Sequence, residues 1–242
     1  MSKNKKKIGI YGKGRWGKIL IENLKKISDI KYIRNTKSKK AHTLSEIDWG
    51  IVVTPDKTHF KIVKNLLENK KNVFCEKPLS RSLIECKYLY NLAKKNKVKL
   101  YVSDIEIFRK IKIEKNFTKI IISRGKKTEC NFKEILYKLM YHDIYILYDS
   151  IKKLKILKIN CYRKNHTLRI NIFFKNKMIN FNYNKNSKKK YHIINNLILK
   201  KKENLVLKMF KYLFSNKVDF NENKKRSLYC INLINKINKQ FF

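Results

Sequence analysis

Three glycines in the pattern Gly12-x-Gly14-x-x-Gly17 are the residues whose spacing points most directly to chemistry. The chain has only six glycines and two prolines in 242 residues, so a glycine cluster indicates backbone geometry that other residues cannot adopt. The pattern lies between a short apolar run, residues 7–11, and a segment with apolar residues at helical spacing. A turn in this context is typical of a pyrophosphate site, although a glycine turn without a ligand has the same pattern. The residues that we expect to contact a nucleotide here are Gly12, Gly14, Arg15, Trp16 and Gly17.

The second predicted strand, residues 30–33, ends without a carboxylate and is followed by Arg34, Asn35 and Thr36. Domains that bind NAD usually place an acidic residue here to accept a hydrogen bond from the ribose 2′-hydroxyl. An arginine with small polar neighbours suits the 2′-phosphate of NADP instead. We therefore expect these three residues to contact the cofactor, with NADP preferred and NAD as the alternative.

The segment Thr54-Pro55-Asp56-Lys57-Thr58-His59 follows the third predicted strand, residues 50–53. Open parallel sheets bind ligands at the carboxyl ends of their strands. We therefore expect Thr54, Pro55 and His59 to line a cofactor site. His59 fits an ordinary histidine in the first turn of a helix equally well.

The segment Glu76-Lys77-Pro78-Leu79 follows the fourth predicted strand at the same edge of the sheet. A lysine beside a carboxylate in a cleft can hold a substrate hydroxyl or stabilise its developing charge. Lys77 is thus a candidate catalytic residue, and both Glu76 and Lys77 are candidate cofactor contacts. The alternative is that Lys77 is one surface lysine among 52.

Two patterns of predicted elements divide the chain. Strands alternate with helices in the first part, which predicts a parallel Rossmann-type sheet with strands at residues 7–11, 30–33, 50–53, 72–75 and 98–102. Later strands follow one another without helices and predict a mainly antiparallel sheet from residues 119–123, 155–162, 168–174, 178–183 and 191–199. We expect helices at 132–151, 204–214 and 225–239, and hence an α/β chain with a dinucleotide-binding domain at 1–104 and a shortened α+β substrate domain at 105–242.

The formal net charge of +42 admits two explanations. The many lysines are accompanied by abundant Asn, Ile, Tyr and Phe, whose codons are rich in A or T. This composition favours a gene with biased base composition over a surface selected to bind polyanions. Five cysteines without metal-ligand spacing predict no metal site and fit a reducing cytoplasm. The short apolar run after the basic N-terminus predicts neither a signal peptide nor a membrane span.

Together these motifs resemble the Gfo/Idh/MocA oxidoreductase family. The resemblance runs through residues 7–103 and includes Val-Val-Thr-Pro, the following His59 and Val-Phe-Cys-Glu-Lys-Pro-Leu. It implies an N-terminal domain that binds NAD or NADP, and a C-terminal domain whose open sheet supports substrate and homo-oligomer contacts. It also implies that Lys77 contacts substrate and cofactor and that His142 acts as acid or base. Lys138 stands where the family commonly has an aspartate four residues before this histidine, and the adjacent Asp143 is an uncertain substitute.

The resemblance implies hydride transfer between a nicotinamide and a hydroxyl or carbonyl carbon of a small, sugar-like substrate. Lys77 would polarise the oxygen, and His142 would exchange the proton. Two alternatives stay open: a family member that binds a nucleotide or a partner without turnover, and a basic nucleic-acid-binding protein. We expect no specific nucleic-acid partner and no membrane association.

Overall fold

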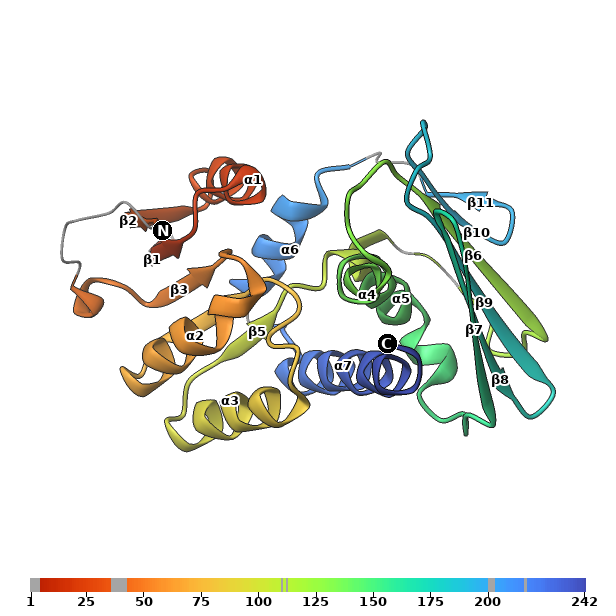
Figure 1. Cartoon of the computed structure of the whole chain (residues 1–242). Helices are drawn as coiled ribbons and strands as arrows, with labels where there is room; N and C mark the ends of the chain where they lie inside the picture. Colours follow the sequence, from red (N-terminus) through yellow and green to blue (C-terminus); the bar gives the residue numbers. More distant parts are fainter. Residues whose placement is uncertain (1–4, 36–42, 110, 112, 200–202, 216) are drawn as a thin grey trace. The chain divides into compact units, whose positions relative to one another are not determined.

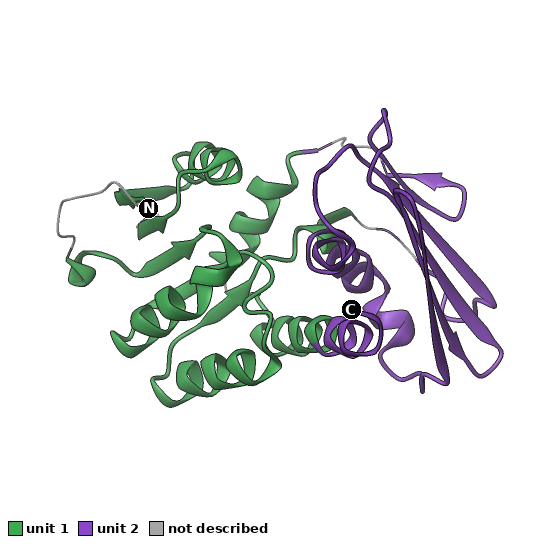
Figure 2. Cartoon of the chain, in the orientation of Figure 1, with its two compact units in different colours: residues 1–109, 204–231 green, residues 110–203, 232–242 purple. Residues whose placement is uncertain are grey.

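The computed structural model describes residues 5–35, 43–109, 111, 113–199, 203–215 and 217–242 (Figure 1). The chain forms two compact units, each made of two chain segments (Figure 2). Unit 1 comprises residues 1–109 and 204–231, and unit 2 comprises residues 110–203 and 232–242.

Unit 1 contains a five-stranded sheet in the order β2-β1-β3-β4-β5, and every neighbouring pair is parallel. The strands are β1 (Lys6–Tyr11), β2 (Ser28–Arg34), β3 (Trp49–Val52), β4 (Asn72–Cys75) and β5 (Leu100–Val102). β3, β4 and β5 are short, mostly buried apolar runs, as is typical of a parallel sheet with both faces covered. This arrangement confirms the predicted parallel sheet.

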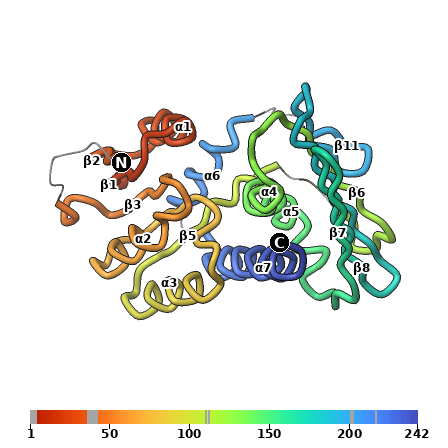
Figure 3. Tube along the Cα trace, in the orientation of Figure 1, coloured from red at the N-terminus to blue at the C-terminus, as the bar shows by residue number. Residues whose placement is uncertain are grey.

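Helices cover both faces of this sheet (Figures 1 and 3). α2 (His59–Glu68) and α3 (Leu83–Lys95) pack together on one face. α1 (Arg15–Leu24) and α6 (Leu205–Leu213) pack together on the other. α3 begins one residue after Ser82, whose hydroxyl caps the helix by accepting a hydrogen bond from the Glu85 N–H.

Residues 204–231 belong to unit 1, which differs from the division expected at residue 104. The apolar face of α6 is buried in the same core as the strands, and the centroids of the Phe210 and Phe74 rings are 4.8 Å apart. In α7 (Phe220–Phe241), the buried Asn223 side chain accepts a hydrogen bond from the Val102 N–H and donates one to the Val102 carbonyl, each at 2.9 Å. Asn223 thus satisfies the backbone hydrogen-bonding groups of Val102 in the edge strand β5. Local sequence patterns do not reveal this long-range contact.

Unit 2 contains a six-stranded sheet in the order β11-β10-β6-β9-β8-β7. Four of its five strand pairs are antiparallel and β6 pairs with β9 in parallel, which confirms a mainly antiparallel sheet. The strands are β6 (Lys119–Gly125), β7 (Lys158–Lys164), β8 (Thr167–Phe174), β9 (Lys177–Asn184), β10 (Tyr191–Ile194) and β11 (Leu197–Ile198). The strand expected at 191–199 is therefore two strands, because Asn195 adopts a left-handed conformation (φ 49°) in a tight turn.

The helix expected at 132–151 is continuous but not uniform. It consists of α4 (Phe132–Ile135), a π-helical turn (Leu136–Met140) and α5 (Tyr141–Ile151). In Figure 1 this helix lies along one face of the unit 2 sheet, and Leu136, Met140 and Ile144 are among its buried residues. In the part of the chain that the structure describes, no helix is long and apolar enough to span a bilayer.

Candidate functional site

The three glycines of the predicted phosphate turn have different structural constraints. Gly12 has φ +116° and its N–H donates to the Arg34 carbonyl at 2.8 Å; a Cβ there would meet the Val53 carbonyl oxygen at 2.7 Å. A Cβ on Gly17 would lie 2.6 Å from the Gly12 oxygen. A Cβ on Gly14 would have no heavy atom within 4 Å. The protein's own packing thus requires Gly12 and Gly17, whereas the space beside Gly14 is open for a group outside the chain.

The N-terminus of α1 opens onto this space. Gly14 is the N-cap residue and provides no side-chain cap, and the first turn of α1 contains no acidic residue. Arg15 and Trp16 are exposed. The free N–H groups and the positive end of the helix dipole therefore suit an anionic group such as a pyrophosphate.

The turn is fastened to the end of β4 by one side-chain hydrogen bond. Trp16 Nε1 donates to Glu76 Oε1 at 2.8 Å, although the two residues are 60 positions apart. Glu76 is 9% exposed, whereas Trp16 is 38% exposed. This bond brings the predicted glycine turn and the predicted Glu-Lys-Pro segment together at one edge of the sheet.

Arg34 lies beside the same turn, because its carbonyl accepts the Gly12 N–H and because it pairs with Tyr11 in the sheet register. Arg34 and Asn35 are both exposed. Neither carries an acidic group, so a phosphate at this position would meet no carboxylate from them. Thr36, the third predicted contact of this group, lies outside the described residues.

His59 has a structural role in this site. It is 1% exposed, and its two ring nitrogens lie 2.8 Å from the carbonyl oxygens of Thr54 and Pro78. These contacts connect the segment after β3 to the segment after β4. Of the two interpretations open for His59, the structure thus favours a histidine that positions the loops, since both nitrogens are occupied by backbone.

Thr54 and Pro55 stand at the carboxyl edge of β3, as predicted. Thr54 Oγ1 accepts a hydrogen bond from Thr58 Oγ1 at 2.7 Å, so its hydroxyl is engaged with the start of α2. Pro55 is exposed and immediately precedes a short 3-10 turn, Asp56–Thr58.

Lys77 is half-buried directly after Glu76, and the peptide bond between Lys77 and Pro78 is cis. Its ammonium group contributes to the surroundings of the buried Cys230: desolvation raises the pKa of that thiol well above its ordinary value, and the charges of Arg226 and Lys77 oppose this. Because Lys77 follows Glu76, which binds Trp16 of the glycine turn, Lys77 lies at the same edge of the sheet as that turn.

In unit 2, His142 is half-buried in the first turn of α5. Lys138 points its ammonium group to Glu134 Oε2 at 3.1 Å and to Cys130 Sγ at 3.2 Å. At the position where the resemblance implies an aspartate, the chain therefore has an exposed lysine that contacts a carboxylate and a thiol.

Asp143 has no exposed surface and is a structural carboxylate. Tyr183 donates a hydrogen bond to Asp143 Oδ2 at 2.9 Å. Arg124 Nη2 and His192 Nε2 lie 2.8 Å and 2.9 Å from Asp143 Oδ1, at ion-pair distance but without aligned hydrogen bonds. Sequence reasoning missed this cluster; the available signal was that Arg124 is one of only eight arginines.

The described residues contain no group of three His, Cys, Asp or Glu side chains placed to hold a metal ion. The structural features instead suit an organic anion: an open space beside Gly14, an uncapped helix start, and exposed cationic and aromatic side chains. The order of the parallel strands and the glycine turn give unit 1 a Rossmann fold.

The comparison with known families agrees with this class. Residues 20–104 match the family described as "Oxidoreductase family, NAD-binding Rossmann fold", which is the Gfo/Idh/MocA family. The resemblance predicted from the motifs is thus confirmed for this segment.

Two curated relatives and one solved structure give the extent of the similarity. The uncharacterized oxidoreductase YrbE of Bacillus subtilis is 31% identical over 39% of this chain and 34% of its own length. The myo-inositol 2-dehydrogenase of Thermotoga maritima is 35% identical over 47% of this chain and 39% of its own. UDP-N-acetylglucosamine 3-dehydrogenase GnnA from Acidithiobacillus ferrooxidans superposes with a TM-score of 0.76 over 95% of this chain and 96% of that one, at 13% identity. The sequence matches thus span little more than a third of the curated relatives, while the fold similarity covers both units.

Proposed function

We propose that the protein is an NAD(P)-dependent oxidoreductase that transfers hydride between a nicotinamide and a hydroxyl or carbonyl carbon of a small, sugar-like substrate. The observation that carries the proposal is the open space beside Gly14 at the start of α1, which has no side-chain cap. The match of residues 20–104 to the oxidoreductase family supports it. The dehydrogenases among its relatives act on an inositol and on a nucleotide sugar. These names support a polyhydroxylated substrate class and identify no particular substrate.

The dinucleotide would be held by unit 1. Backbone N–H groups at the start of α1 would bind the pyrophosphate, with Trp16 and Glu76 fixing the turn. NADP is the preferred cofactor in this proposal, because Arg34 is exposed beside Gly12 and no carboxylate stands at Arg34 or Asn35 to receive a ribose hydroxyl.

When bound, the nicotinamide would supply the hydride chemistry. Lys77 would hold the reacting oxygen of the substrate and stabilise charge that develops on it. His142 would accept or return the proton of the hydroxyl group. Binding and orientation of the substrate by these side chains would account for most of the protein's own contribution to the rate.

A second candidate function is nucleotide binding without turnover. The observation that favours it is Lys138, since a cation held by Glu134 and Cys130 stands where a carboxylate would orient His142. A neutral histidine without that carboxylate can still relay a proton, so the departure weakens catalysis rather than excluding it.

We also propose that the chain forms a homo-oligomer through the open face of the unit 2 sheet, and that it works in a reducing cytoplasm. Ile121, Tyr162 and Ile198 of this sheet are exposed. Among the described residues, Figure 1 shows no helix on the sheet face opposite α4 and α5. None of the five cysteines, all of which lie in the described part of the chain, forms a disulfide bond. Size-exclusion chromatography with light scattering tests the oligomer, and Ile198→Lys should shift it toward the monomer.

Oxidation of NADPH, followed across a panel of sugars, polyols and their keto forms, tests the enzymatic proposal. We expect turnover with at least one member and its loss in Lys77→Ala, with nucleotide binding retained. Tight NADPH binding without turnover on the whole panel, unchanged by Lys77→Ala, would favour the second candidate instead.

A further inference from the structure

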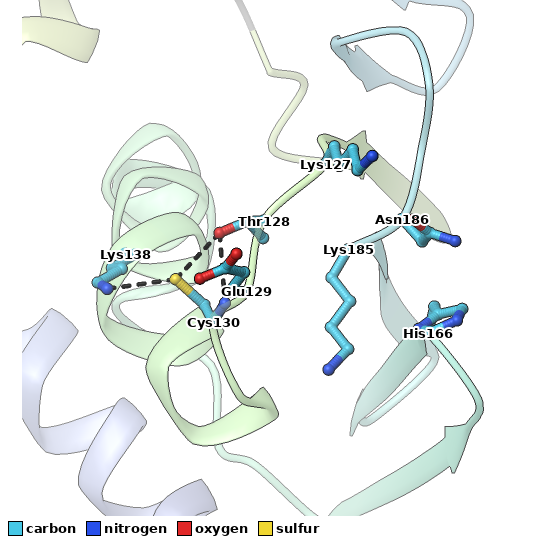
Figure 4. Close-up of a pocket in the computed structure, with 8 residues that line it drawn as sticks. All are labelled: Lys127, Thr128, Glu129, Cys130, Lys138, His166, Lys185 and Asn186. Atoms are coloured by element: carbon cyan, nitrogen blue, oxygen red, sulfur yellow. Dashed lines mark hydrogen bonds between the residues drawn. The ribbon is translucent and has the colours of Figure 1, made fainter.

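A wide pocket in unit 2 surrounds a cysteine that the proposed oxidoreductase function does not use (Figure 4). Its volume is about 790 Å³, within the range of sites for small organic ligands. The walls come from the loop after β6, the start of the long helix, the β7–β8 turn and the residues after β9. The lining residues are Lys127, Thr128, Glu129, Cys130, Lys138, His166, Lys185 and Asn186.

Cationic groups outnumber acidic groups around this pocket. Three lysines and a histidine line the pocket together with one carboxylate, Glu129, while Glu134, which is not a lining residue, pairs with Lys138. Lys185 also covers the face of the Phe132 ring, with its ammonium 5.1 Å from the ring centre. The pocket is therefore suited to a ligand with negative charge.

Cys130 is half-exposed in this pocket and receives two polar contacts on its sulfur. Thr128 Oγ1 donates to Sγ at 3.1 Å, and Lys138 Nζ lies 3.2 Å from it (Figure 4). Desolvation acts to raise the pKa of this thiol, but the hydrogen bonds from Thr128 and Lys138 and the lysine's charge outweigh it, so the pKa is lowered. The thiolate is the nucleophilic form of cysteine.

The other four cysteines have the opposite environment. Cys75, Cys86 and Cys230 are buried, and burial raises the pKa of each. Cys161, on β7, is half-exposed like Cys130, yet desolvation raises the pKa of its thiol despite the nearby charge of Arg163. Cys161 is thus an internal control of similar exposure for the reactivity of Cys130.

We propose that Cys130 is a site of covalent modification by disulfides of small anionic thiols, which the cationic pocket binds before reaction. The Cys130 thiolate attacks one sulfur of the disulfide and forms a new S–S bond with it. The S–S bond of the reagent breaks, and its second sulfur leaves as a thiolate that takes a proton from water. Cys130 is oxidised in this step, and the disulfide that serves as oxidant is reduced. The proposal does not depend on the proposed oxidoreductase function.

The test uses the reduced full-length protein with oxidised glutathione, followed by intact mass and peptide mapping. We expect the first adduct at Cys130, at least about tenfold faster than at Cys161. Oxidised glutathione should react faster than the cationic disulfide cystamine, and added salt should narrow that difference because it screens the lysines. Equal rates at Cys130 and Cys161, or equal rates for the two reagents at low salt, would overturn the proposal.

Matched variants separate the contributions. Lys138→Gln should slow the reaction at Cys130 by about tenfold, since it removes both a hydrogen bond and a charge from the thiolate. Lys133→Gln, on an exposed lysine of α4 that does not line the pocket, should leave the rate unchanged. An equal effect of the two substitutions would contradict a specific role of Lys138. The comparison of Cys130 with Cys161 is made on the original sequence, so it tests the proposal even if a variant does not fold.

Discussion

The indole of Trp16 donates a hydrogen bond to the carboxylate of Glu76 at 2.8 Å and so joins the glycine turn to the end of β4. One partner comes from the candidate phosphate turn and the other from the candidate catalytic segment. The position of Lys77 is therefore coupled to the turn through the adjacent Glu76. The Trp16–Glu76 hydrogen bond would therefore help to fix the position of a dinucleotide bound at this turn relative to Lys77.

Replacement of Trp16 by phenylalanine tests this coupling. Trp16→Phe keeps an aromatic ring but removes the donor, which leaves a mostly buried carboxylate without this partner. We expect the dissociation constant for NADPH to rise by about tenfold, equivalent to about 1.4 kcal/mol. Titration of nicotinamide fluorescence measures it. Trp49→Phe, in a strand away from the turn, is the control, and equal losses of affinity would contradict a specific role of the Trp16–Glu76 bond.

Two glycine substitutions should separate folding from binding. In Gly17→Ala the new methyl group would meet the Gly12 oxygen at 2.6 Å, so we expect a lower melting temperature. In Gly14→Ala the methyl group has open space, and the residue's φ of −69° suits alanine. Thermal unfolding of Gly14→Ala should thus be near that of the original sequence, whereas its nucleotide affinity should fall at least about tenfold. If Gly14→Ala bound NADPH normally, the space beside Gly14 would not be the pyrophosphate site.

His59→Leu tests whether this histidine positions loops. The substitution leaves the Thr54 and Pro78 carbonyls without their ring partners, so we expect the free energy of unfolding to fall by about 2–3 kcal/mol. Urea unfolding measures the change. His166→Leu, at an exposed position, should change stability by less than about 0.5 kcal/mol. Unchanged stability of His59→Leu together with weaker nucleotide binding would instead indicate a cofactor contact.

The carboxylate of Asp143 should be required for the stability of unit 2. Asp143→Asn leaves the nearby Arg124 charge buried without its counterion, and we expect a loss of about 3–5 kcal/mol in the free energy of unfolding. Asp149→Asn is a matched control on the same helix, since Asp149 pairs with Lys152 at 2.9 Å but is 49% exposed. The control should lose at most about 1 kcal/mol. Similar losses in the two variants would show that the buried cluster contributes no more than a surface pair.

Much of unit 1 could be predicted from sequence because its signals are local. Apolar runs located the strands, and the glycine pattern located the turn between β1 and α1. The assignment of residues 204–231 to unit 1 could not be predicted, because Asn223 binds Val102 across 121 positions. The Asp143 cluster was missed for the same reason, since Arg124, Asp143 and Tyr183 come from three separate elements.

The dissociation constants for NADPH and NADH, measured by nicotinamide fluorescence on the original sequence and on Arg34→Asp, test the central claim most directly. We expect saturable binding of both nucleotides by the original sequence, with NADPH bound more tightly. Arg34→Asp should reverse this preference, because a carboxylate repels the 2′-phosphate and accepts a hydrogen bond from the ribose hydroxyl. An equal or tighter constant for NADH in the original sequence would contradict the NADP preference. The absence of saturable binding of either nucleotide by the folded protein would contradict the dinucleotide site itself.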